Sequence, residues 1–214
     1  MRLMFIDLPC GGVEKTNTIQ NKTLPNKEMP LKKHIVIVHA VLLFLLIQTL
    51  WPQERSFIPP SPPGITTIII VRHAEKDTTK TDPPLTPQGK ERARLLAHIL
   101  RSSGVVAIYS TQYIRTEQTV QPIAESLHLK PQIFTINPDK IEEHAATLVS
   151  TILRERVGNV VLIASHSNVI PLLLRDMGIA AKITIGDLEY DNLFIVTTTI
   201  DGGANLLRLR YGRN

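Results

Sequence analysis

The chain has 214 residues, which is enough for one domain with a sizeable core and an additional tail. Its formal net charge is +5, and residues 1–63 carry seven Lys/Arg against four Asp/Glu, whereas residues 64–214 carry seventeen against fifteen. The nearly balanced domain, which has few aromatic residues and no basic stripe, argues against nucleic-acid binding, and the single cysteine, Cys10, excludes an internal disulfide and a cysteine-ligated metal site in the domain.

The first 63 residues are predicted to lie outside the folded domain. Residues 1–34 are rich in Asn, Thr, Lys and Pro, which predicts disorder, or a misassigned start codon with the true start at Met29. Residues 35–51 form an almost wholly apolar run after a basic pair, typical of a signal peptide or an uncleaved signal anchor, with a buried core helix as the alternative. Residues 52–63 are proline-rich and predict an extended linker. This layout predicts that the domain is membrane-anchored or secreted, outside the cytoplasm.

Strand-like and helix-like stretches alternate through residues 64–214. The expected strands are Ile68–Val71, Val105–Ser110, Gln132–Ile136, Val160–Ala164, Leu193–Thr199 and Ala204–Leu209. The expected helices run from Pro87, with Thr86 as N-cap, to near Gly104, and over Tyr113–Leu127, Asp139–Arg156 and Asn168–Met177. This alternation predicts an α/β fold: a three-layer α/β/α sandwich with a mainly parallel central sheet and an antiparallel hairpin at its C-terminal end.

Polar side chains follow three of the predicted parallel strands. They are Arg72 and His73, then Ser110 and Arg115, and finally Ser165, His166 and Ser167. In open α/β sheets, ligands bind at the carboxyl ends of strands, so we expect these side chains to converge on one rim. Arginine offers a fixed fork of donors for phosphate oxygens, and a neutral histidine can act as a nucleophile. These residue types at the rim are suited to binding a phosphate group.

These motifs resemble the histidine phosphatase superfamily, the phosphoglycerate mutase-like proteins. The residues that carry the resemblance are Arg72-His73-Ala74-Glu75, Leu85-Thr86-Pro87-Gln88-Gly89, the stretch Ser110–Thr119 and Ser165-His166-Ser167-Asn168. The resemblance covers about residues 66–212, and the order and spacing of the motifs make the combination specific although each motif is short. Ala74 stands where the family more usually has glycine.

The resemblance implies a role for each matching residue. His73 resembles the nucleophile that accepts a phosphoryl group, and Arg72, Arg115 and His166 resemble the groups that stabilise charge on its nonbridging oxygens. Ser165 and Ser167 either add phosphate-binding donors or cap the turn. No metal or other cofactor is implied, because the arginines take the role of a divalent cation.

The general acid is not identified by sequence. Family mutases carry a glutamate between the second arginine and the second histidine, and Glu142 and Glu143 lie in that interval; Asp139–Glu142, however, also has the form of a helix capping box. Glu75 is the other candidate, and it could equally pair with an arginine. Residues 189–192 either face the pocket or form a turn.

The sequence therefore predicts a histidine acid phosphatase-like phosphoric monoester hydrolase that forms a phosphohistidine on His73. Its expected partners are a phosphorylated small molecule, glycan or protein as substrate, and the membrane through the apolar run. The alternatives are a phosphoglycerate mutase-type phosphotransferase and a non-catalytic envelope protein that binds phosphorylated ligands. The sequence makes no prediction of the oligomeric state.

Overall fold

The computed structural model describes His39, Leu42 and residues 64–79 and 81–212. Except for His39 and Leu42, the predicted segments 1–34, 35–51 and 52–63 lie outside the described residues. In the described part of the chain, no helix combines the length and the apolarity needed to cross a membrane.

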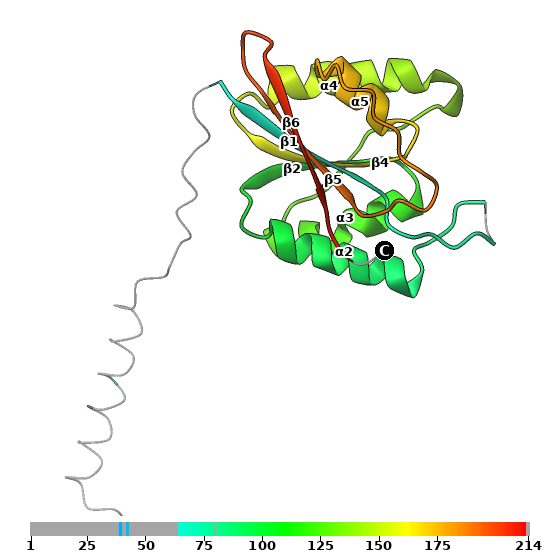
Figure 1. Ribbon diagram of the computed structural model, residues 1–214. Helices are drawn as coiled ribbons and strands as arrows, with labels where there is room; N and C mark the ends of the chain where they lie inside the picture. The colour runs from blue at the N-terminus through cyan, green and yellow to red at the C-terminus, as the bar shows by residue number, and fades with distance from the viewer. Residues whose placement is uncertain (1–38, 40–41, 43–63, 80, 213–214) are drawn as a thin grey trace, which may run out of the picture. The chain divides into compact units, whose positions relative to one another are not determined.

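The domain is built on one six-stranded sheet with the strand order β3-β2-β4-β1-β5-β6 (Figure 1). The strands are β1 (Thr66–Arg72), β2 (Val105–Ser110), β3 (Gln132–Ile133), β4 (Val160–Ser165), β5 (Asn192–Thr198) and β6 (Ala204–Arg210). Strands β1 to β4 run parallel, whereas β5 pairs antiparallel with both β1 and β6. The predicted mainly parallel sheet with a terminal antiparallel hairpin is confirmed.

Helices cover both faces of the sheet (Figure 1). Helices α2 (Pro87–Leu100) and α3 (Ile114–Leu127) lie on one face, and α4 (Ile141–Glu155) and α5 (Ile170–Asp176) lie on the other. The side chain of Thr86 accepts a hydrogen bond from the Gly89 amide, as expected of the predicted N-cap before Pro87.

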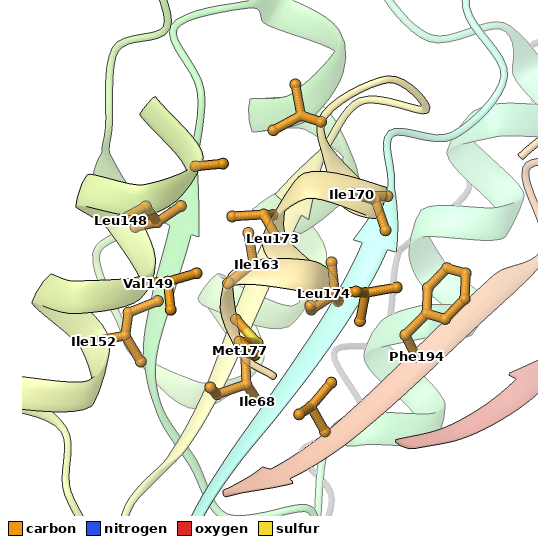
Figure 2. Packing of buried hydrophobic residues seen from close by; sticks show 14 of the residues in the cluster. Ile68, Leu148, Val149, Ile152, Ile163, Ile170, Leu173, Leu174, Met177 and Phe194 are labelled. Atoms are coloured by element: carbon orange, nitrogen blue, oxygen red, sulfur yellow. The ribbon is translucent and has the colours of Figure 1, made fainter. Parts of the chain in front are cut away.

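Strand β1 lies in the middle of the sheet and is buried on both faces. Because side chains alternate along a strand, Ile68 and Ile70 pack into the core under α4 and α5, whereas Ile69 and Val71 pack into the core under α2 and α3. Figure 2 shows the first of these cores, where Ile68 and Ile163 of the sheet face Leu148 of α4 and Leu173 of α5. A strand fixed from both sides holds the residues at its carboxyl end in one position.

The structure corrects three of the predicted boundaries. Strand β3 ends at Ile133 instead of Ile136, because the side chain of Gln112 binds both the N–H and the C=O of Ile136 (3.0 and 2.9 Å) and draws the chain away from the sheet. Helix α5 starts at Ile170, two residues after the predicted start. The predicted capping box at Asp139 is wrong: residues 138–140 form a 3₁₀ turn whose Asp139 amide is capped by Asn137 (3.0 Å), and α4 follows it.

Gly89 at the start of α2 is required by a close approach of two backbones. A Cβ atom at this position would lie 2.2 Å from the carbonyl oxygen of Glu75. That carbonyl also accepts a hydrogen bond from the amide of Thr86 (2.9 Å). The N-terminus of α2 is therefore seated directly on the chain that follows β1.

Candidate active site

The carboxyl ends of β1 and β4 meet side by side. Arg72, the last residue of β1, pairs in register with Ser165, the last residue of β4. The amide of His73 then donates to the carbonyl oxygen of Ser165 at 2.9 Å. Because this bond extends the sheet ladder by one step, His73 and His166 leave the sheet at adjacent positions, and their ring centroids lie 5.5 Å apart.

The ring of His73 is oriented by its own backbone neighbour. The residue is 4% exposed, and its Nδ1 lies 2.8 Å from the carbonyl oxygen of Ala74. A carbonyl oxygen can only accept, so Nδ1 carries the proton and donates, which leaves the lone pair on Nε2. The pKa of His73 is lowered to about 3, chiefly by burial, and the nearby charges of Arg72, Arg115 and Lys76 contribute in the same direction. His73 is therefore neutral at physiological pH and has an available nucleophilic nitrogen.

His166 is the second buried imidazole of the rim. It is 8% exposed, and its Nε2 shares a hydrogen bond of 3.1 Å with the hydroxyl of Thr111. Its ring also meets the ring of Tyr113 edge-on, with centroids 5.4 Å apart. Burial lowers the pKa of His166 to about 3, and the charges of His73 and Arg115 act in the same direction.

Arg72 is clamped between a loop and an aromatic ring. Its Nη1 donates to three backbone carbonyl oxygens of the segment 186–189, at 2.9, 2.9 and 3.3 Å. The guanidinium carbon lies 4.1 Å from the ring centroid of Tyr190, within range of a cation–π contact. Its Nε is buried and has no hydrogen-bond partner among the described residues, which leaves one donor of this guanidinium unpaired.

Arg115 reaches the same rim from the first turn of α3. Its Nη1 lies 3.4 Å from an oxygen of Asp82, and its guanidinium carbon lies 4.2 Å from the ring centroid of Tyr113. As in Arg72, Nε is buried and has no partner. Burial lowers the pKa of both guanidinium groups below its usual value, but arginine stays charged at neutral pH.

These groups line a pocket of about 310 Å³. Its lining residues are Arg72, His73, Lys76, Tyr113, Arg115, Ile136, Pro138, Ile141, His166, Ser167 and Asn168. A larger cavity of about 680 Å³ lies between α3 and β3, but its lining contains neither the two rim histidines nor the two rim arginines. We place the chemistry in the smaller pocket, because two neutral imidazoles and two arginines with free donors converge there.

The arrangement has counterparts among known proteins. Residues 68–135 match the model of the histidine phosphatase superfamily (branch 1). This match supports the histidine phosphatase superfamily for the segment that it covers. The matched segment includes Arg72, His73 and Arg115, and His166 lies outside it, directly after the end of β4.

Two curated relatives and one solved structure define this family resemblance more closely. The chain is 39% identical over 70 residues to PE-PGRS family protein PE_PGRS11 of Mycobacterium tuberculosis, and 35% identical over 97 residues to phosphoserine phosphatase 1 of Hydrogenobacter thermophilus. These matches cover 32% and 42% of this chain, but only 12% and 44% of the relatives. The structure of the protein histidine phosphatase SixA complexed with tungstate superposes with a TM-score of 0.54, at 20% identity, over 67% of this chain and 96% of SixA.

The two serines of the family motif occupy different positions. Ser165 is 1% exposed, and its hydroxyl oxygen is buried without a partner. Ser167 is half-buried and lines the pocket. Ser167 can therefore reach a bound phosphoryl group directly, whereas Ser165 contributes its backbone carbonyl to the amide of His73.

None of the three glutamates predicted as general acids is among the residues that line this pocket. The carboxylate of Glu75 is held by Arg92 of α2, with bonds of 2.7 to 3.0 Å, which is the arginine pairing that the sequence left open. Glu142 and Glu143 are exposed on the first turn of α4, and Glu143 pairs with Lys140 at 3.1 Å. Among the described residues, no cluster of three or more His, Cys, Asp or Glu side chains could hold a metal ion.

The segment 189–192 contacts Arg72 through the carbonyl oxygen of Glu189 and the ring of Tyr190. Tyr190 stacks on Arg72 and lies 5.9 Å from the ring of His73, centroid to centroid. Its neighbours point to β6 instead: Glu189 pairs with Arg210 at 3.0 Å, and Asp191 pairs with Arg210 at 2.6 Å. Tyr190 therefore contacts the site residues, whereas the turn that the sequence offered as the alternative lies at residues 187–188.

Several residues that support the site had no predicted role. The hydroxyl of Thr119 accepts a hydrogen bond from the Ala74 amide at 2.9 Å and donates to the Arg115 carbonyl at 2.7 Å, so it ties the chain after His73 to helix α3. Asp82 binds Arg115, and Lys76 lines the pocket. The only signal for Thr119 was its place in the family motif, and the loop containing Asp82 and Lys76 offered no periodic pattern.

Proposed function

We propose that the chain is a phosphatase that hydrolyses phosphomonoesters through a phosphohistidine on His73. The observation that carries the proposal is the orientation of this ring: Nδ1 donates to the Ala74 carbonyl, so the lone pair of Nε2 is available. Burial holds the pKa of His73 at about 3, which keeps that lone pair unprotonated at neutral pH.

The reaction has two displacements. In the first, Nε2 of His73 attacks phosphorus while the bond to the leaving oxygen breaks. The guanidinium groups of Arg72 and Arg115 balance charge on the nonbridging oxygens through the donors that are unpaired in the pocket, and His166 adds an imidazole N–H. In the second, water attacks the phosphohistidine and releases orthophosphate. The protein contributes position and positive charge, which a loose phosphoryl transition state requires.

The function is tested with p-nitrophenyl phosphate and the full-length chain. We expect His73→Ala to remove turnover, whereas His98→Ala, at an exposed position of α2, leaves it unchanged. Rapid denaturation at alkaline pH followed by mass spectrometry should detect a phosphoryl group on the peptide that contains His73. Unchanged hydrolysis by His73→Ala would contradict the assignment, and binding of phosphate without turnover would favour a phospho-ligand-binding protein.

We further propose that the domain acts outside the cytoplasm, as a membrane-anchored or secreted protein. The support is the apolar run at residues 35–51, which follows Lys32 and Lys33 and precedes a proline-rich stretch. Its substrate would then be a phosphorylated small molecule, glycan or protein of that compartment. A reporter that is active only outside the cytoplasm, fused after Pro63, should give a signal; activity of a cytoplasm-specific reporter at the same position would refute this location.

A further inference from the structure

Lys76 adds a third positive charge to the lining of the pocket. It is half-buried, it lines the pocket, and its charge is near enough to lower the pKa of His73. Its backbone is fixed by an antiparallel bridge to Leu85, and the next amide, of Asp77, donates to Pro84 at 2.9 Å. Lys76 is thus held beside the nucleophile by the loop that returns to α2.

The pocket is lined by more positive charges than are needed to bind the nonbridging oxygens of one phosphoryl group. Among the described residues, the lining contains three cationic side chains, Arg72, Lys76 and Arg115, and no carboxylate. Arg115 shares its charge with Asp82 at 3.4 Å, whereas Lys76 has no ion-pair partner in the described part of the chain. Two arginines match the nonbridging oxygens of the phosphoryl group that is transferred, so Lys76 remains for a second negative group of the substrate.

Two acidic side chains near the pocket, those of Glu75 and Asp82, are engaged as hydrogen-bond acceptors. Glu75 accepts three hydrogen bonds from Arg92, and both oxygens of Asp82 accept from the Ile114 amide at 3.2 Å. Neither carboxylate lines the pocket. This environment suits a leaving group that departs as an anion and is met by a cation.

We propose that the chain removes the terminal phosphoryl group of an organic diphosphate. Lys76 binds the inner phosphate, which departs with the organic group as a phosphomonoester. This inference rests on the phosphatase function proposed above and names its substrate class. A phosphate monoester leaves readily without protonation because its second pKa is about 6. A diphosphate therefore satisfies both features of the pocket, the additional cation and the engaged carboxylates.

The atoms balance without a proton donor. Nε2 of His73 forms a bond to the terminal phosphorus, the bond from that phosphorus to the bridging oxygen breaks, and the electron pair stays on this oxygen. The phosphomonoester departs as a dianion beside Lys76. Water then attacks the phosphohistidine, the N–P bond breaks with its electron pair returning to Nε2, and both protons of the water remain on the orthophosphate.

The test compares phenyl diphosphate with phenyl phosphate as substrates of the full-length chain. Both compounds release orthophosphate. The leaving group contains a phosphate in phenyl diphosphate and lacks one in phenyl phosphate. The variants are Lys76→Met, which removes the charge, and Lys76→Arg, which retains it. Lys90→Met, at an exposed position of α2, is the matched control.

We expect the wild-type chain to favour the diphosphate in kcat/KM. Lys76→Met should lower kcat/KM for the diphosphate by about tenfold to a hundredfold, the worth of one charge-assisted hydrogen bond, and lower that for phenyl phosphate by less than about threefold. Lys76→Arg should restore most of the preference, and Lys90→Met should leave both values unchanged.

Two results would overturn the inference while the phosphatase function stands: a wild-type preference for phenyl phosphate, or equal losses on both substrates in Lys76→Met. If the wild-type chain releases orthophosphate from neither compound, the phosphatase function itself is contradicted, and the inference falls with it. Selective loss on the diphosphate alone supports Lys76 as the residue that selects the leaving group.

Discussion

The carboxylate of Glu75, two residues after the nucleophile His73, forms an ion pair with the guanidinium of Arg92 of helix α2. Arg92 Nε lies 2.9 and 3.0 Å from the two oxygens of Glu75, and Nη2 lies 2.7 Å from one of them. The side chains are 5% and 13% exposed. Arg92 Nη1 also donates to the carbonyl oxygen of Tyr211 at 2.6 Å. The pair therefore fastens α2 and the end of the sheet to the chain that follows His73.

Loss of one partner of this pair should destabilise the fold. Arg92→Met leaves the carboxylate of Glu75 buried and unpaired, and breaking a buried pair in this way costs about 3–5 kcal/mol. We expect urea denaturation to show a lower free energy of unfolding by this amount. Arg94→Met, which removes an exposed arginine of the same helix, is the control and should change stability by less than about 0.5 kcal/mol. Equal effects of the two variants would contradict the structural role.

The same pair predicts the kinetic behaviour of Glu75. Glu75→Gln retains an oxygen acceptor for Arg92 but cannot donate the proton of a carboxylic acid. Because the side chain is directed at α2 and does not line the pocket, we expect turnover of p-nitrophenyl phosphate to fall by less than about fivefold, in step with any loss of stability. A loss of about a hundredfold in kcat with unchanged stability would identify Glu75 as the general acid after all.

Thr119 should affect both stability and rate, because its hydroxyl holds the Ala74 amide. Thr119→Val preserves the shape of the side chain but leaves a buried N–H without an acceptor, which costs about 1–3 kcal/mol. The carbonyl of Ala74 orients the ring of His73, so we also expect kcat to fall by about tenfold. The control is Thr147→Val, whose hydroxyl binds a carbonyl on the exposed face of α4. If kcat is unchanged in folded Thr119→Val, the positioning role is excluded.

Sequence patterns predicted those site residues whose positions are set by the ends of strands. The buried run at Ile68–Val71 and the parallel order of the strands were sufficient to bring His73 and His166 to one rim, because parallel strands end on the same side of the sheet. Contacts between side chains that are far apart in the sequence produce no periodic pattern from which they could be predicted. The stacking of Tyr190 on Arg72 depends on how a loop returns to the sheet.

The early end of β3 illustrates the same limit. The residues up to Ile136 suit a strand, but the side chain of Gln112 competes for the backbone groups of Ile136. Local propensity contains no information about that competition. The position of Lys76 was equally hidden, because it depends on a single backbone bridge to Leu85.

Asp82 offers a test of whether Arg115 is positioned by its carboxylate partner. Asp82→Asn removes the charge at 3.4 Å from Arg115 but retains an oxygen acceptor for the Ile114 amide. We expect KM for p-nitrophenyl phosphate and the inhibition constant of inorganic phosphate to rise by about threefold to tenfold, with little change in kcat. The contrary outcome is a fall in kcat that grows as the leaving group becomes more basic, from p-nitrophenyl to phenyl phosphate. That dependence would show Asp82 to be a proton donor.

The buried imidazoles predict how stability depends on pH. Burial lowers the pKa of His73 and of His166 from 6.5 to about 3, so between these values the unfolded chain binds protons that the folded chain does not. Stability must then rise with pH through this window: the contribution is complete above 6.5 and is lost as the pH falls toward 3. Each histidine adds a slope of up to about 1.4 kcal/mol per pH unit.

The measurement is the free energy of unfolding from urea titrations between pH 5 and 6.5, where few carboxylates titrate. His73→Gln and His166→Gln should each remove part of the slope while the folded state persists, because glutamine is neutral at every pH in this range. His98→Gln, at an exposed position, should retain the wild-type slope. A slope that is the same in the wild-type chain and in both rim variants would show that these imidazoles bind protons equally in the folded and unfolded states, which contradicts a pKa lowered by burial.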